Sequence, residues 1–172
     1  MPPTLLFLGD LDERHGVDLL LRAMPAILRH HPQARLVVVG DGPLAEPLAA
    51  YCRYLQLEDA VTFLPASAAP PDADVVVVPG REGVGLRAIE AARSARKPVV
   101  ATHEAAAGGA EHEADALLVY PSENAIAAAV VRLLNDPELA RKLGEAGHRR
   151  WLDPFSEIAP FPPGRDAPES RS

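Results

Sequence analysis

The sequence is poor in cysteine, in net positive charge and in long apolar runs, and each shortage excludes a class of protein. Cys52 is the single cysteine among the 172 residues, so no internal disulfide can form, and a reducing, cytoplasmic compartment is expected. The formal net charge of −7 argues against nucleic acids and anionic membrane surfaces as partners, because both select clustered lysine and arginine. No run is long enough for a transmembrane segment, and the first three residues lead into a predicted strand, not into a signal peptide.

Aromatic residues are also scarce, at 5%, so leucine, valine and alanine must build the core of a chain that is 48% hydrophobic. Short apolar runs predict strands at residues 4–9, 35–40, 61–64, 75–78, 98–101 and 116–119. Apolar residues at helical spacing predict helices at residues 17–28, 44–57, 86–96, 124–134 and 138–151. Pro25 lies inside the first of these helices, where we expect a local defect.

This alternation predicts an α/β fold, in which a doubly wound, Rossmann-like parallel sheet of about six strands carries helices on both faces. Residues 1–153 are expected to form this one domain. Two segments depart from the alternation of strands and helices. Residues 65–74 are too few for a helix and two turns, so one crossover is expected to be irregular. Residues 154–172 are proline-rich with few apolar residues, which is typical of a disordered tail.

Ligands of doubly wound sheets lie beyond the carboxyl ends of the strands, which points to the loops at residues 9–16, 40–43, 80–85 and 102–109. In the third of these loops, Glu82 precedes the turn Gly83-Val84-Gly85, and Glu90 follows in the next helix. Backbone amides at a helix N-terminus suit a phosphate, and flanking carboxylates can accept hydrogen bonds from hydroxyls. The pattern indicates a nucleotide-sugar site. The structural alternative is a tight turn beside two solvated glutamates.

Two further groups have a structural interpretation and a functional one. His103, Glu104 and residues 111–113 offer ligand types that suit divalent metals, but their spacing matches no defined motif, so we expect a solvated polar loop. No metal site is therefore predicted in that loop.

Trp151 and Phe155 are expected to pack the last helix onto the sheet, the alternative being an exposed docking surface.

Eight segments, in one order along most of the chain, together resemble a known family. They are residues 8–9 with 14–20, 34–44, 57–64, 73–75, 82–86 with 90–91, 97–102, 133–139 and 155–156. The sequence is similar to the C-terminal, donor-binding domain of the retaining GT-B glycosyltransferases, the "glycosyl transferases group 1" family.

The resemblance implies a role for each matching residue. It makes Glu82 the contact to the sugar, and thus the candidate catalytic residue, and it makes Glu90 the contact to the ribose. The remaining candidate donor-binding residues are Gly9, Asp10 and His15 in the first loop, Gly40 and Gly42 beside the base, and Gly83, Val84, Gly85 and Leu86 in the phosphate-facing turn.

The departures from the family lie in the first loop. Asp10 stands where the family has an arginine that holds the donor diphosphate, and His15 stands where it has a lysine. An aspartate there repels a diphosphate, since cationic groups at the leaving oxygens are the main contribution of a protein to such a site. Arg14 and Arg81 are candidate substitutes from neighbouring positions.

The family reaction is transfer of a sugar from a nucleotide-sugar, such as a UDP- or GDP-sugar, to an acceptor hydroxyl with retention, and it requires neither cofactor nor metal. The sequence starts at the first strand of the donor domain, so we expect half an enzyme or a relic that is inactive alone. Its expected partners are a nucleotide-sugar or nucleoside diphosphate and a separate acceptor-binding domain or chain. The alternative is a non-catalytic binding or scaffold module that retains the fold.

Overall fold

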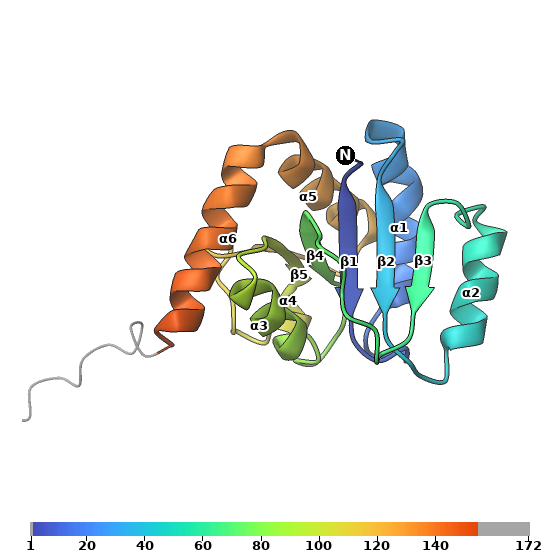
Figure 1. Ribbon diagram of the computed structural model, residues 1–172, viewed down its shortest axis with the longest axis horizontal. Helices are drawn as coiled ribbons and strands as arrows, with labels where there is room; N and C mark the ends of the chain where they lie inside the picture. Colours follow the sequence, from blue (N-terminus) through green and yellow to red (C-terminus); the bar gives the residue numbers. More distant parts are fainter. Residues whose placement is uncertain (1, 155–172) are drawn as a thin grey trace, which may run out of the picture.

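A computed structural model describes residues 2–154 and arranges them around one six-stranded sheet (Figure 1). The strands are β1 (Thr4–Leu8), β2 (Arg35–Val39), β3 (Val61–Leu64), β4 (Val75–Val78), β5 (Val99–Thr102) and β6 (Leu117–Val119). All neighbours are parallel, and their order in the sheet is β3-β2-β1-β4-β5-β6. The predicted α/β, doubly wound fold is confirmed.

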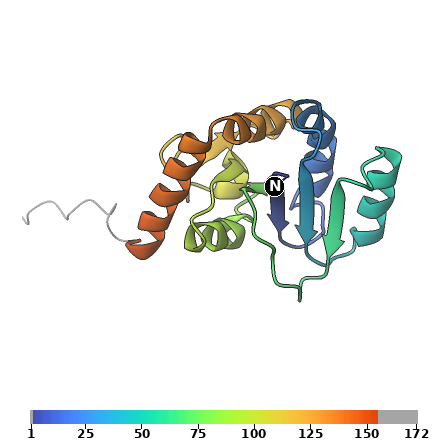
Figure 2. The same ribbon diagram turned by 45° about the horizontal axis from the view of Figure 1, so that its top comes forward.

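The helices cover both faces of this sheet (Figure 2). They are α1 (Val17–His30), α2 (Ala45–Tyr54), α3 (Leu86–Ser94), α4 (His103–Ala106), α5 (Glu123–Asn135) and α6 (Pro137–Leu152). Helices α1 and α5 pack against each other on one face, whereas α3 lies on the other face and packs against α6.

Successive strand residues feed two separate cores, because side chains of a strand alternate between the faces of a sheet. Leu5 and Phe7 join the core under α1 and α5, whereas Leu6 joins the core under α3. Strand β4 is buried along its whole length. A sheet covered on both sides thus explains why the strands are continuous apolar runs.

The strand order reverses between β1 and β4, and this switch point positions the candidate site. The chain leaves β1 toward β2 and leaves β4 in the opposite direction toward β5, so right-handed crossovers put α1 and α3 on opposite faces. Both helices begin at the same edge of the sheet, where the arrows of β1, β2 and β3 end at the bottom of Figure 1. Ligands of open α/β sheets bind at such a point.

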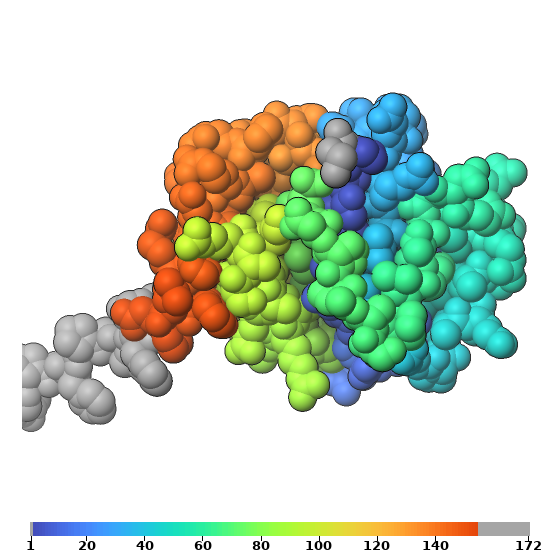
Figure 3. All heavy atoms as spheres, viewed as in Figure 1, coloured from blue at the N-terminus to red at the C-terminus, as the bar shows by residue number. Residues whose placement is uncertain are grey.

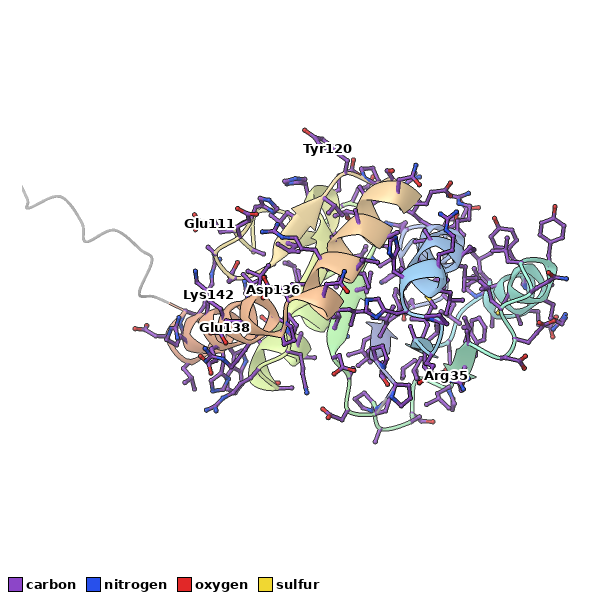
Figure 4. The ribbon with its side chains drawn as sticks, turned by 90° about the horizontal axis from the view of Figure 1, so that it is seen from above. Arg35, Glu111, Tyr120, Asp136, Glu138 and Lys142 are labelled. Carbon is purple, nitrogen blue, oxygen red and sulfur yellow. The ribbon has the colours of Figure 1, made fainter. Side chains whose placement is uncertain are left out.

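The two C-terminal helices begin at side-chain caps. The Ser122 hydroxyl accepts a hydrogen bond from the Ala125 amide at 3.3 Å and starts α5. Asp136, labelled in Figure 4, caps α6 by accepting from the Leu139 amide at 3.0 Å, and Pro137 follows as the first helical residue. The boundary between α5 and α6 thus falls in the gap between the predicted helices at residues 124–134 and 138–151.

Among residues 2–154, no helix covers β1 and β2 on the face of the sheet that carries α3 (Figure 1). Residues 65–74, green in Figure 3, cross this region without forming a helix and leave a groove lined by Leu6, Leu8, Pro70 and Pro71. The predicted irregular crossover is confirmed. Because residues 65–74 are too few to form a helix, an irregular segment takes the place of a helix beside this part of the sheet.

The structure adds one helix to the expected elements, contradicts the expected packing of Trp151, and leaves most of the expected tail outside the described residues. The short helix α4 was not predicted, and Pro25 lies within α1 without ending it. Trp151 does not pack onto the sheet, because 43% of it is exposed and its ring stacks on His148 at 5.6 Å. Phe155 and nearly all of the proposed tail, residues 154–172, lie outside the described residues, so the tail and the domain boundary stay predictions. No helix within residues 2–154 is long and apolar enough to cross a bilayer.

Candidate functional site

The loops after β1, β2 and β4 are joined by backbone hydrogen bonds at the carboxyl edge of the sheet. The Arg81 amide donates to the Arg14 carbonyl at 2.8 Å, which ties the loop after β4 to the loop after β1. The Leu11 amide donates to the Asp41 carbonyl, and the Leu44 amide donates to the Leu11 carbonyl, both at 2.9 Å. Three of the four loops expected to form the site therefore lie together.

Asp12 organises the first loop. One of its carboxylate oxygens accepts from the amides of Arg14 and His15 at 3.0 Å and bonds to Nδ1 of His15 at 2.7 Å. Burial raises the pKa of Asp12, but the hydrogen bonds from His15, the charge of His15 and the Arg14 amide outweigh it, so the pKa lies below its ordinary value of 3.8. His15, with its ring against Gly9, is thereby fixed in place.

Asp10, Asp12 and His15 are the one group of metal-ligating types that comes together within residues 2–154. One ligand atom from each lies within 4.8 Å of the others. Asp10 is exposed, while Asp12 already accepts three hydrogen bonds from the loop. Hydrogen bonds within the loop thus hold Asp12 and His15 together without an ion, and His103 and Glu104 form no such cluster.

The glycines of the second loop have a packing role. A Cβ on Gly40 would lie 1.8 Å from the Gly9 carbonyl oxygen, and one on Gly42 would lie 2.4 Å from the Leu11 carbonyl oxygen. Side chains at either position would push the first and second loops apart. Their presence is therefore explained by loop packing, and a contact of Gly9, Gly40 or Gly42 with a nucleotide remains a prediction.

The turn at residues 83–85 is in place, but its amides are largely engaged. Gly83 donates to the Glu104 carbonyl at 2.8 Å, Val84 to the Arg81 carbonyl at 3.2 Å, and Gly85 to the Ala105 carbonyl at 3.3 Å. The carbonyls of Glu104 and Ala105 belong to α4, the helix that sequence analysis missed.

The N-terminus of α3 is the part of this turn in which backbone amides are left without a helical partner. Its first helical hydrogen bond runs from the Ile89 amide to the Gly85 carbonyl, so the amides of Leu86, Arg87 and Ala88 have no carbonyl of the helix to bond. Gly85 supplies no side-chain cap there, and Gly16 supplies none to α1. Of the four turn residues named from the sequence, Leu86 is thus the one whose amide is left without a carbonyl partner.

Thr102 holds the third and fourth of these loops together, and sequence analysis did not single it out. Its fully buried hydroxyl donates to the Gly80 carbonyl at 2.6 Å and accepts from the Ala105 amide at 3.1 Å, which caps α4. The sequence feature that could have indicated this role of Thr102 is a hydroxyl residue at the end of an otherwise apolar strand.

Glu82 and Glu90 both face solvent. Glu82 has φ of 51°, which is uncommon for a residue with a side chain, and its carboxylate lies 3.2 Å from the Arg14 guanidinium. Glu90 lies one helical turn after Leu86, so the two share a face of α3. The sequence did not reveal the Arg14–Glu82 ion pair, which crosses the switch point.

The family model for glycosyl transferases group 1 matches residues 2–136, which include every strand and every loop of this site. The chain belongs to this family. A relative 35% identical over 192 residues is the GDP-mannose-dependent alpha-(1-6)-phosphatidylinositol monomannoside mannosyltransferase of Mycobacterium tuberculosis. The alignment covers 96% of this chain and 48% of that enzyme, so the chain spans about half the length of the glycosyltransferases that it matches.

Solved structures show the same fold. Sucrose-phosphate synthase of Thermosynechococcus elongatus is 33% identical with a TM-score of 0.73, and the match covers 88% of this chain and 41% of that one. HepE of Anabaena, solved in complex with UDP-glucose, is 23% identical with a TM-score of 0.73 over 86% of this chain and 43% of its own. The GT-B resemblance stated from the sequence is confirmed.

Proposed function

We propose that this chain binds the nucleotide-sugar donor of a sugar-transfer reaction, in which the sugar passes to an acceptor hydroxyl. Membership of the glycosyl transferases group 1 family supports the reaction class, and the relative named for GDP-mannose supports a nucleotide-sugar as donor. A nucleoside diphosphate would occupy the same site. The acceptor would come from a separate domain or chain, since this chain spans about half of its relatives.

The observation that carries this proposal is the pair of open helix N-termini at the β1/β4 switch point. Helices α1 and α3 start there from opposite faces, and neither has a side-chain cap. Helix α2, which starts after β2, also lacks one, whereas α4, α5 and α6 are capped by Thr102, Ser122 and Asp136. A helix N-terminus carries a partial positive charge and unpaired amides, so two of them favour an anion.

The two glutamates would divide the rest of the donor between them. Glu90, one turn into α3, would accept hydrogen bonds from the ribose, and Glu82, before the turn, would contact the sugar as the catalytic residue. The base would lie beside Gly40 and Gly42, and Gly9, Asp10 and His15 would border the diphosphate. We propose that no metal ion or other cofactor takes part, because amides and guanidinium groups here supply the positive charge. A cytoplasmic location is part of this proposal, which the single, buried Cys52 supports.

Calorimetric titration with UDP, GDP and ADP tests the proposal. At least one should bind, and Glu90→Ala should weaken it about tenfold, because a carboxylate that accepts from ribose hydroxyls contributes on that order. Glu58→Ala is the matched control, since Glu58 is exposed and lies before β3, at the opposite edge of the sheet. Equal losses in both variants, or none in Glu90→Ala, would refute the ribose assignment.

A non-catalytic binding or scaffold module is the second candidate. It is favoured by the charge of the first loop, where the carboxylates of Asp10 and Asp12 lie close together. The same titration separates the two functions. Failure of all three nucleotides to bind at millimolar concentration would favour the scaffold.

A further inference from the structure

The first loop carries more negative than positive charge, so a diphosphate that binds there needs a cationic side chain. Between Gly9 and Gly16 the acidic residues are Asp10, Asp12 and Glu13, and the one arginine is Arg14. An anion that reaches the switch point along this loop is repelled unless the Arg14 guanidinium faces it.

Arg14 is anchored directly over the switch point. Its amide donates to Asp12 at 3.0 Å, and its carbonyl accepts from the Arg81 amide at 2.8 Å. The backbone of Arg14 is thus fixed from both loops, while 59% of its side chain is exposed. The guanidinium can therefore change partner without any movement of the loop.

In the structure, that partner is Glu82. The two side chains meet at 3.2 Å, and 74% of the Glu82 side chain is exposed. Glu82 immediately precedes Gly83, whose amide is bonded to the Glu104 carbonyl, so its backbone is also held in place. The ion pair joins the first loop to the turn that starts α3.

We propose that Arg14 is the diphosphate-binding cation of this chain and that Glu82 occupies it until a donor arrives. An exposed ion pair contributes little to stability, and a guanidinium binds a phosphate through two parallel hydrogen bonds, so the diphosphate displaces the carboxylate. Glu82 is released at the same moment and becomes free to accept a hydrogen bond from the sugar. This inference rests on the proposed function and adds Arg14 to it as a binding residue.

The exchange predicts opposite effects for the two partners. Arg14→Gln removes the cation and should weaken binding of a nucleoside diphosphate. Glu82→Gln removes the competitor for that cation and should strengthen binding, but only while Arg14 is present. A double-mutant cycle isolates this dependence.

Titration calorimetry with UDP and GDP at low salt provides the test, using the wild-type chain, Arg14→Gln, Glu82→Gln and the double variant. We expect Arg14→Gln to bind about tenfold more weakly, Glu82→Gln about threefold more tightly, and the double variant as weakly as Arg14→Gln. Arg14→Lys should recover part of the affinity, because it keeps the charge but not the planar fork. Arg22→Gln is the matched control, because Arg22 is an exposed arginine of α1 paired with Asp18, and it should bind within about twofold of wild type.

Each alternative result overturns a different claim. Wild-type affinity in Arg14→Gln, with loss in Glu90→Ala, would remove Arg14 from the site and leave the proposed function standing. An equal gain from Glu82→Gln with and without Arg14 would refute the exchange, because the effect would then be simple removal of a negative charge. Absence of binding to the wild-type chain would overturn both this inference and the proposed function.

Discussion

Asp10 and His15 are the residues that most distinguish this chain from the family it belongs to, because they stand where that family carries two cations. The structure gives His15 a structural role, since its ring bonds to Asp12 and packs against Gly9. Asp10 is exposed and makes no such contribution. We therefore expect the charge of this loop to be the residue-level property that most limits binding of a diphosphate.

Restoring both cations tests that limit. Asp10→Arg with His15→Lys adds about three units of positive charge, counting His15 as neutral, and should strengthen binding of a nucleoside diphosphate about tenfold or more at low salt. The gain should shrink as ionic strength rises, because exposed charges are screened. Calorimetry with the unphosphorylated nucleoside is the control. An equal effect on nucleoside and diphosphate would show that the first loop does not face the phosphates.

Cys52 illustrates a residue whose chemistry is suppressed by its position. It lies in α2 with 3% of its surface exposed. Burial raises the pKa of its thiol above the ordinary value of 9.0, and the nearby Glu58 carboxylate raises it further, against the opposing effect of Arg53. The thiol thus stays protonated at neutral pH.

We accordingly expect Cys52 to react slowly with Ellman's reagent in the native protein, by about tenfold or more relative to the urea-unfolded chain at the same pH, because only the thiolate is the nucleophile. Raising the pH toward 9.0 should increase the absolute rate of the native reaction less than that of the unfolded one, because the raised pKa keeps the thiolate fraction of the native protein lower. Similar rates in native and unfolded protein would contradict the burial of this residue.

Among the secondary structure elements, α6 is attached to the rest of the domain mainly through α3. Buried Asp115, just before β6, accepts from Arg93 of α3 and Arg150 of α6, both at 2.7 Å. At the other end of the contact, Gly144 of α6 lies directly against the Arg96 carbonyl. The helix is therefore held by a charge network and by a close backbone approach.

Gly144→Ala should destabilise the domain by about 1–3 kcal/mol, although alanine favours a helix, because the added Cβ would lie 2.3 Å from the Arg96 carbonyl oxygen. Gly147→Ala is the matched change in the same helix. Its Cβ would meet a side-chain carbon of Arg93 at 3.1 Å, which can yield more easily than backbone. Urea unfolding should therefore show the larger loss at Gly144, and an equal or reversed order would mean that α6 is not seated as described.

On the scale of the whole molecule, the proposed donor site opens at the carboxyl edge of the sheet, and the chain spans 48% of the mannosyltransferase that it resembles. The acceptor side of the reaction is proposed to come from elsewhere. The domain described here would then be a donor-binding unit whose activity depends on a partner.

We therefore expect the 172-residue chain alone to form no product from UDP- or GDP-sugars, with or without small acceptors, because it spans about half of its relatives and because Asp10 and His15 stand where the family carries two cations. A coupled assay for nucleoside diphosphate release measures this. Turnover clearly above background that Glu82→Ala abolishes would show a complete active site instead.

Much of the fold followed from local patterns. Continuous valine runs such as residues 75–78 and the helical spacing of Val17–His30 specify strand and helix through hydrophobic burial, and their alternation specifies a parallel sheet. Helix α4 was missed because its four residues form only when Thr102 caps it and its carbonyls receive the turn amides. Such short elements depend on contacts between loops, not on their own periodicity.

The sequence by itself determined the order of elements, the two glutamates beside the turn and the loss of cations at Asp10 and His15, because these are properties of residue type and spacing. Only the tertiary structure decided which donors remain open at the turn and where Arg14 points. Amides of residues 83–85 are taken by carbonyls from residues 81, 104 and 105, and Arg14 reaches Glu82 across the switch point. Those partners lie on different loops, and a hydrogen bond or ion pair between loops exists only once the sheet has brought their ends together.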